Sequence, residues 1–191
     1  ERDGDAEIYL MNPDGSDQRP ITDNEADDMA PAWSPDGTLI VFESDRDDPR
    51  PRACFPTCNY NLYVMNADGS EPRRLTSLPG AEWHADWSPD GRTLIFTAGD
   101  IGAESMGIYT LDLDGGEPQP LLVDESANNA ADWSPDGTQI AFSSDREGGL
   151  DIYVMYADGS GMRKIVDTGL DDYFPDWSPD GAQLVFFAAD F

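Results

Sequence analysis

The chain has 191 residues, of which 39% are hydrophobic, enough for a folded domain with its own core. Its 39 acidic residues outnumber the 11 Lys and Arg, so the formal net charge is −28. This charge argues against nucleic-acid binding, which needs a basic surface, and against binding to anionic membranes. No apolar run reaches the length of a membrane span, and we expect no insertion into a membrane.

Two motifs alternate along the chain and define a repeat. An Ile-Tyr or Leu-Tyr pair, followed by Asp-Gly, begins at Ile8, Leu62, Ile108 and Ile152. Trp-Ser-Pro-Asp-Gly begins at Trp33, Trp87, Trp133 and Trp177. Both motifs recur at spacings of 54, 46 and 44 residues. Repeats of this length with Gly and Pro turns and β-branched or aromatic runs are typical of four-stranded propeller blades.

The predicted strands follow one order along the chain. The chain opens with the third and fourth strands of a repeat, near residues 8–11 and 20–21. A first strand then ends at Trp33, Ser-Pro-Asp-Gly turns the chain, and a second strand covers 39–42. The order repeats until the chain closes with a first strand at 175–177 and a second at 184–187.

The two ends of the chain are therefore complementary halves of one blade. An open propeller would expose unpaired strand edges, and pairing the halves removes them. We predict an all-β fold, a single four-bladed β-propeller domain over residues 1–191. Each blade has four antiparallel strands, and the last blade is closed by the N- and C-terminal half-blades. The alternative is pairing between copies, which produces a larger ring or an open polymer.

Residues 47–61 form an insertion, because the matching connection in the last full repeat is about ten residues shorter. It holds the only two cysteines, Cys54 and Cys58, and no second Cys or His pair exists to complete a zinc site. A disulfide between them is the favoured interpretation, and it implies an oxidising compartment.

The insertion is also basic and aromatic on an acidic chain. It is interpreted either as a tolerated surface loop or as a contact element for an acidic surface, including another copy of the chain. In the second interpretation the contact residues are Arg50, Arg52 and Phe55. Trp83 lies outside the repeat pattern and is a further candidate for an exposed contact.

Acidic residues recur at two positions of the first strand. Asp86, Asp132 and Asp176 directly precede the motif Trp, and Asp28, Glu82 and Asp172 lie five residues before it. The first strand is the innermost strand of a propeller blade, so these carboxylates approach the central axis and repel one another. Bound Ca²⁺ would relieve the repulsion, and these six residues are the candidate ligands. The alternative is that they cap loops or face solvent.

The motifs resemble the TolB-like branch of WD-type β-propellers, whose repeat has Trp-Ser-Pro-Asp-Gly, an apolar strand, Ser-Asp-Arg, Ile-Tyr and Asp-Gly-Ser. Ser44-Asp45-Arg46 and Ser144-Asp145-Arg146 match this pattern fully. The resemblance covers essentially the whole chain and implies an extracellular or periplasmic location and a role in protein contacts. The chain departs from the family in having four repeats where six or more are usual.

No catalytic motif accompanies the repeats. Gly-x-Ser-x-Gly is absent, and His84 is the only histidine. We therefore predict no enzymatic activity. The expected function is that of a secreted or periplasmic protein-interaction or scaffold module. The alternative is a structural subunit that assembles into an extracellular fibre or surface layer, aided by cations.

Overall fold

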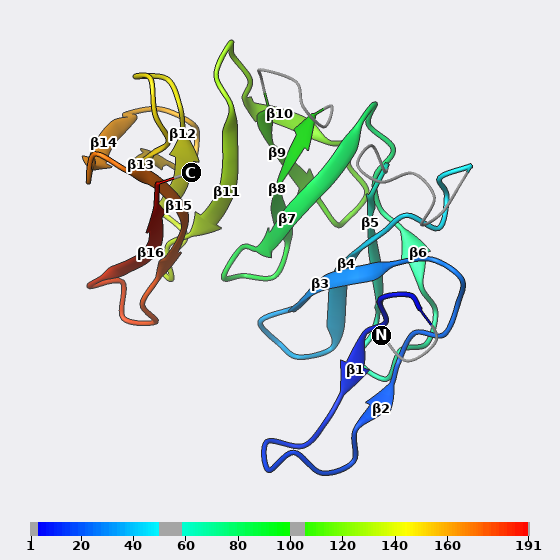
Figure 1. Cartoon of the computed structure of the whole chain (residues 1–191). Helices are drawn as coiled ribbons and strands as arrows, with labels where there is room; N and C mark the ends of the chain where they lie inside the picture. The colour runs from blue at the N-terminus through cyan, green and yellow to red at the C-terminus, as the bar shows by residue number, and fades with distance from the viewer. Residues whose placement is uncertain (1–3, 50–58, 100–105, 191) are drawn as a thin grey trace.

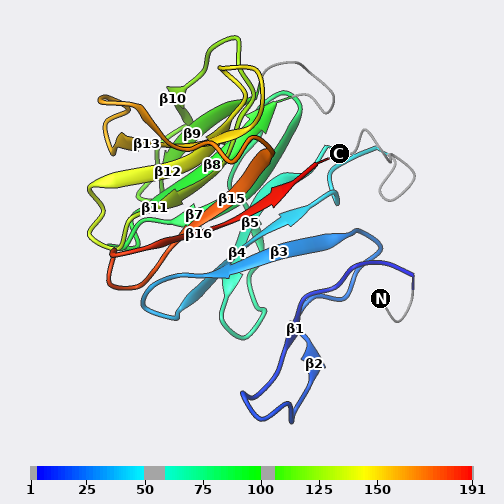
Figure 2. The ribbon, with the colours of Figure 1, turned by 60° about the vertical axis from the view of Figure 1, so that its left-hand side comes forward.

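A computed structural model describes residues 4–49, 59–99 and 106–190. In these residues sixteen β-strands form five antiparallel sheets, and there is no helix that could cross a membrane. Figures 1 and 2 show the sheets following one another in a curved row. The all-β fold with four-stranded antiparallel blades is thus confirmed.

Three of the sheets are complete blades. The first blade comprises β3 (Asp28–Trp33), β4 (Leu39–Ser44), β5 (Asn61–Asn66) and β6 (Arg73–Arg74). The second comprises β7 (Ala81–Trp87), β8 (Thr93–Gly99), β9 (Gly107–Asp112) and β10 (Gln119–Leu122). The third comprises β11 (Asn128–Trp133), β12 (Gln139–Ser144), β13 (Asp151–Tyr156) and β14 (Arg163–Val166). In each blade the strands pair in sequence order.

Short polar contacts define the turn after each motif Trp. In the first blade the Ser34 hydroxyl donates to Asp36 at 2.7 Å, and the Gly37 N–H donates to the Ser34 carbonyl at 2.8 Å. Gly37 has a φ of 71°, the left-handed conformation that glycine adopts most easily. The same contacts recur in the Trp-Ser-Pro-Asp-Gly turns of the other repeats. The motif is therefore a hairpin signal with a local physical cause.

The hydrophobic core lies between successive blades. Val41, Leu62 and Val64 of the first blade pack with Trp87 and Phe96 of the second, and all five are buried. An equivalent cluster joins the second and third blades. Each blade therefore depends on its neighbours for burial of its apolar face.

The remaining two sheets are half-blades at opposite ends of the row (Figure 1). The N-terminal half-blade is β1 (Tyr9–Leu10) with β2 (Arg19–Pro20), and the C-terminal half-blade is β15 (Asp171–Trp177) with β16 (Leu184–Ala189). The predicted closure of a last blade is not found, because the described residues place these hairpins in two separate sheets. Matching sequences determine which edges can pair, whereas the packing angle between successive blades decides whether those edges meet. The count of four blades is likewise not established, and a single domain over 1–191 stays a prediction.

Candidate functional site

Each innermost strand carries a bulge three residues before its motif Trp. The pairing register shifts there in β3, β7, β11 and β15. The four residues at this position have positive φ between 48° and 53°: Ala30, His84, Ala130 and Phe174. A non-glycine residue in this conformation costs about 1–2 kcal/mol, and bulges redirect side chains near functional sites. The repeated bulge therefore shapes the concave face of the row of blades.

In two of the four strands the preceding blade holds the bulge in place. The His84 N–H donates to Glu43 Oε1 at 2.8 Å, and the Ala130 N–H donates to Thr97 Oγ1 at 3.1 Å. Both acceptors lie on the second strand of the preceding blade. The bulges at His84 and Ala130 thus each rely on a polar side chain that reaches them across the gap between blades.

Glu43 is an unusual acceptor because it is only 5% exposed. Burial disfavours its charged form and raises the pKa of Glu43 to about 7, although the hydrogen bond from His84 acts in the opposite direction. A titratable carboxyl therefore lies directly beneath the bulge of β7.

The aspartates before the motif Trp also connect blades. The Trp133 N–H donates to Asp86 Oδ2 at 3.3 Å, and the Trp177 N–H donates to Asp132 Oδ2 at 2.8 Å. The Asp86 and Asp132 carboxyls are themselves in hydrogen-bonding contact. Burial is the main cause that raises the pKa of Asp86 and raises that of Asp132 to about 7, and the nearby charge of Asp176 adds to both shifts.

These features line one groove on the concave face. The groove has a volume of about 520 Å³, and its walls come from β7, β11, β15 and β16, including His84, Asp86, Asp132 and Phe174. The His84 and Phe174 rings meet edge to face, 5.1 Å apart. The imidazole is partly shielded from water by the groove, which lowers the pKa of His84. The groove therefore presents carboxyl groups beside an aromatic pair.

The other three predicted metal ligands lie away from this groove. Asp28, Glu82 and Asp172 are buried at the starts of their strands and accept hydrogen bonds from the loops around them. Within the described segments, no three His, Cys, Asp or Glu side chains are grouped so that they could hold a metal ion. The six candidates thus do not converge on one site, and calcium binding stays a prediction.

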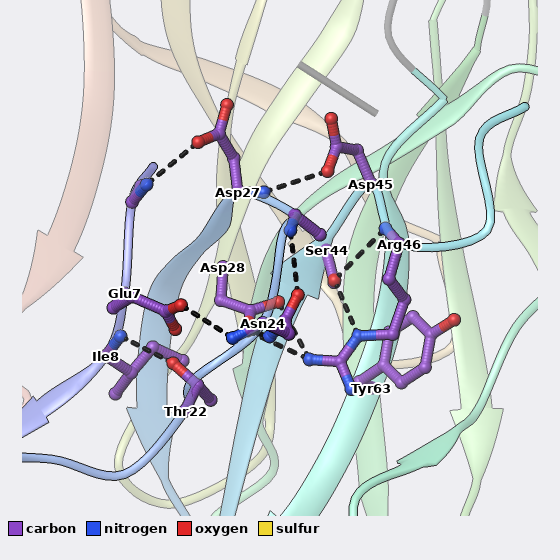
Figure 3. A network of polar contacts seen from close by, with 12 residues as sticks. Glu7, Ile8, Thr22, Asn24, Asp27, Asp28, Ser44, Asp45, Arg46 and Tyr63 are labelled. Atoms are coloured by element: carbon purple, nitrogen blue, oxygen red, sulfur yellow. Dashed lines mark hydrogen bonds and ion pairs between the residues drawn. The ribbon is translucent and has the colours of Figure 1, made fainter. Parts of the chain in front are cut away.

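Asp28 illustrates the structural role of the buried acidic residue five positions before the motif Trp. Its carboxylate has no exposed surface and binds the Arg46 guanidinium at 2.8 and 2.9 Å. The Arg46 guanidinium also lies over the Tyr63 ring, 4.6 Å from its centre. Figure 3 shows the network continuing to the N-terminal half-blade, where the Asn24 N–H donates to Glu7 at 2.9 Å. The Ser-Asp-Arg element therefore ties a blade to the segment that precedes it.

The predicted contact residues have mixed outcomes. Trp83 is half-buried and lines a second hollow of about 440 Å³ with Tyr173 and Phe174, next to the groove. Arg50, Arg52, Phe55, Cys54 and Cys58 lie outside the described residues, so the disulfide and the contact role of the insertion stay predictions.

The sequence analysis did not identify Glu43 or the bulge residues. The four bulge positions hold Ala, His, Ala and Phe, which share no chemistry that a motif search could detect. A bulge interrupts the two-residue alternation of inward and outward side chains along a strand. An interrupted alternation in the first strand is therefore the one signal that the sequence offers.

Comparison with known proteins agrees with this architecture. A family model described as the TolB beta propeller domain matches residues 102–190. The Tol-Pal system protein TolB of Alcanivorax borkumensis is 36% identical over 69 residues, which cover 36% of this chain and 14% of that protein. The crystal structure of TolB from Acinetobacter baumannii superposes with a TM-score of 0.76 at 23% identity, over 95% of this chain and 43% of that one.

The chain is therefore built from propeller blades, and its repeats over residues 102–190 match those of the TolB-like β-propeller family. It spans less than a third of the length of the curated relatives that it matches.

The comparisons contradict the prediction that the chain is not an enzyme, because a relative and several structural neighbours are named as enzymes. A protein named uncharacterized peptidase YuxL, from Bacillus subtilis, is 36% identical over 90 residues, which cover 47% of this chain and 12% of that protein. A crystal structure of a puromycin hydrolase shares the fold, with a TM-score of 0.66 at 20% identity over 88% of this chain and 28% of that one. The absence of a catalytic motif in the repeats was not a valid reason to exclude an enzyme, because a propeller can be one part of a catalytic protein.

Proposed function

We propose that the chain is a protein-interaction module whose concave groove binds a peptide segment with a basic side chain. The observation that carries this proposal is the groove itself, in which the contacting carboxyls of Asp86 and Asp132 lie beside the His84–Phe174 aromatic pair. The acceptors suit an ammonium or guanidinium group, and the rings suit the apolar stem of a Lys or Arg side chain. The match of residues 102–190 to the TolB beta propeller domain supports a role in protein contacts.

The electrostatics of the groove support a cationic ligand. Two neighbouring carboxyls with raised pKa values are costly to ionise together, and a bound cation offsets this cost. The net charge of −28 adds long-range attraction for a basic partner. Binding should therefore strengthen as the pH rises through about 7, where Asp132 loses its proton.

The test is fluorescence anisotropy with a labelled peptide rich in Lys and Arg, measured at pH 6 and pH 8 at one salt concentration. The Asp86→Asn/Asp132→Asn double variant should weaken binding about tenfold or more, since the partner cation loses its charged acceptors. The Glu117→Gln/Glu125→Gln double variant is the matched control, because it removes the same charge from two exposed positions away from the groove. Equal weakening in both double variants would show that only net charge matters and would refute a specific site.

A second candidate is a propeller that presents peptides to a catalytic centre. The identity to the Bacillus subtilis protein named as a peptidase favours it. Mass spectrometry of the same peptide after incubation separates the two candidates, because hydrolysis produces fragments whereas binding alone leaves the peptide intact.

We also infer that the chain works in the periplasm or outside the cell, as its similarity to TolB and its cysteine pair suggest. Peptide mapping of the exported protein without reductant tests this, since a Cys54–Cys58 disulfide lowers the peptide mass by two hydrogens.

A further inference from the structure

The second hollow, next to the groove, is built from one repeated position of the innermost strands. Trp83, Asn129 and Tyr173 each directly precede a bulge residue, in β7, β11 and β15. All three line this hollow, which has a volume of about 440 Å³, and none of its lining residues lies on β1 or β16. Equivalent positions of successive blades therefore meet in one space, where the bulges redirect the side chains.

Rings form most of the wall of the hollow. Trp83, Tyr173 and Phe174 line it together with His84 and Met106. The Tyr173 and Phe174 rings are stacked with their centres 6.0 Å apart, and the His84 ring meets Phe174 edge to face. Burial lowers the pKa of His84, so its imidazole is uncharged at neutral pH. The hollow is thus a mainly aromatic, uncharged space that suits a ring.

Asn129 adds to this wall a polar group without a partner among the described residues. It is only 9% exposed, yet no described residue donates to or accepts from its side-chain amide. A buried amide without hydrogen bonds is unfavourable, because folding removes its bonds to water. The amide therefore favours a ligand whose polar group can both donate and accept a hydrogen bond at this wall.

The other two buried asparagines of the described segments have partners for their amides. Asn61 donates to Glu82 at 3.1 Å. Asn128 donates to Asp124 at 2.8 Å and accepts from Arg146 at 2.7 Å. Asn129 is the exception, and it is the one of the three that lines a hollow. Its unused amide is therefore a feature of this hollow rather than of buried asparagines in the fold.

A phenol meets both requirements of the hollow. Its ring packs against the aromatic walls, and its hydroxyl can donate to and accept from the Asn129 amide. A plain phenyl ring would leave the amide without a bond. A sugar ring carries a hydroxyl on most of its carbons, and the aromatic walls would leave most of these without partners. An anionic ligand is repelled by the net charge of −28.

We propose that the hollow binds a tyrosine side chain, and that the peptide in the groove carries this tyrosine close to its basic residue. The hollow and the groove share His84 and Phe174 as lining residues, so neighbouring side chains of one peptide can enter both. The placement of the tyrosine in the peptide rests on the proposed function, whereas tyrosine binding by the hollow can be tested without it.

The first experiment compares labelled peptides that differ only at the residue beside a single Lys, which is Tyr, Phe or Ala. Fluorescence anisotropy at pH 8 should show the Tyr peptide binding about fivefold more tightly than the Phe peptide, because only Tyr bonds the amide. The Phe peptide should in turn bind more tightly than the Ala peptide. The series is repeated with the variable residue one position further from the Lys on either side. Equal binding of Tyr and Phe at every position would overturn the proposal.

Two variants assign the preference to the hollow. Asn129→Leu removes the amide at similar volume, so it should abolish the preference for Tyr over Phe and leave the Ala peptide unaffected. Trp83→Ala removes part of the ring wall, so it should weaken the Tyr and Phe peptides by the same factor. If urea unfolding shows that Asn129→Leu does not fold, Asn129→Ala provides the same comparison. A Tyr preference that survives loss of the amide would refute the assignment.

The second experiment uses N-acetyltyrosine amide, which has no basic group and so does not need the groove. Saturation-transfer NMR should detect its binding to the wild type and to Tyr156→Ala, a control at an exposed aromatic position outside the hollow, and a loss of binding in Trp83→Ala. If this amide binds whereas basic peptides do not, the proposed function is wrong and the hollow is still a tyrosine site. If basic peptides bind without a Tyr preference and the amide gives no signal, the hollow proposal alone is wrong.

Discussion

Replacement of Glu43 by Gln should change how stability depends on pH. The pKa of this buried carboxyl rises from 4.5 to about 7 in the folded protein. Between these values the folded protein binds more protons than the unfolded chain. The contribution of Glu43 to the free energy of unfolding is therefore largest at acidic pH and is lost as the pH rises through 7. At about 1.4 kcal/mol per pKa unit, Glu43 changes the free energy of unfolding by about 3 kcal/mol over this pH range. Solvent screening reduces this value little, because Glu43 is only 5% exposed.

Glu43→Gln keeps an oxygen that can accept the His84 N–H and removes the charge. We expect the variant to gain about 2–3 kcal/mol over the wild type between pH 5 and pH 8, measured by urea unfolding at each pH. Asp86 and Asp132 titrate in both proteins, so the difference isolates Glu43. Glu25→Gln, at an exposed position, is the control and should show no such pH dependence. A stability difference that is the same at pH 5 and pH 8 would refute the reasoning.

Two further predictions use matched positions in the repeats. Arg46→Met should cost about 3–5 kcal/mol, because it leaves a buried carboxylate without its cation. Arg146→Met should cost clearly less in the same urea titration, since its buried partner is a neutral amide. Gly69→Ala should destabilise by about 1–3 kcal/mol more than Gly15→Ala, because an added Cβ would overlap the Ile21 carbonyl only at Gly69. Both glycines have positive φ, so backbone strain is common to the pair and thermal unfolding of the two variants reports the overlap.

The sequence predicted the strands well because their signals are local. Each Trp-Ser-Pro-Asp-Gly turn is held by contacts within five residues, such as those between Ser34 and Asp36, and each repeat supplies the same contacts. The order of strands within a blade follows from these turns. The relation between the two half-blades does not, because it depends on the angle between successive blades and so on packing among residues far apart in the chain.

The site was harder to predict because its main residues are defined by contacts between blades. In the sequence, Glu43 looks like a solvent-facing polar residue of a strand. Only the approach of His84 from the next blade makes it a buried hydrogen-bond acceptor. In the sequence, Asp28 is one more acidic residue of the first strand. Only the folded structure shows that its carboxylate is paired with Arg46.

The aspartates before the motif Trp can be explained either as cation ligands or as structural contacts between blades. Their convergence suggested a cation site, yet Asp86 and Asp132 use an oxygen each to accept the N–H of the next motif Trp. The first blade has Ala32 at this position, and there the indole N–H of Trp87 donates to the Ala32 carbonyl at 3.1 Å instead. A link between neighbouring blades is thus kept when the carboxylate is missing, which is the behaviour expected of a structural contact. The groove that holds Asp86 and Asp132 is a consequence of that contact, and the proposed peptide binding would use the carboxylate oxygens that do not accept the Trp N–H groups.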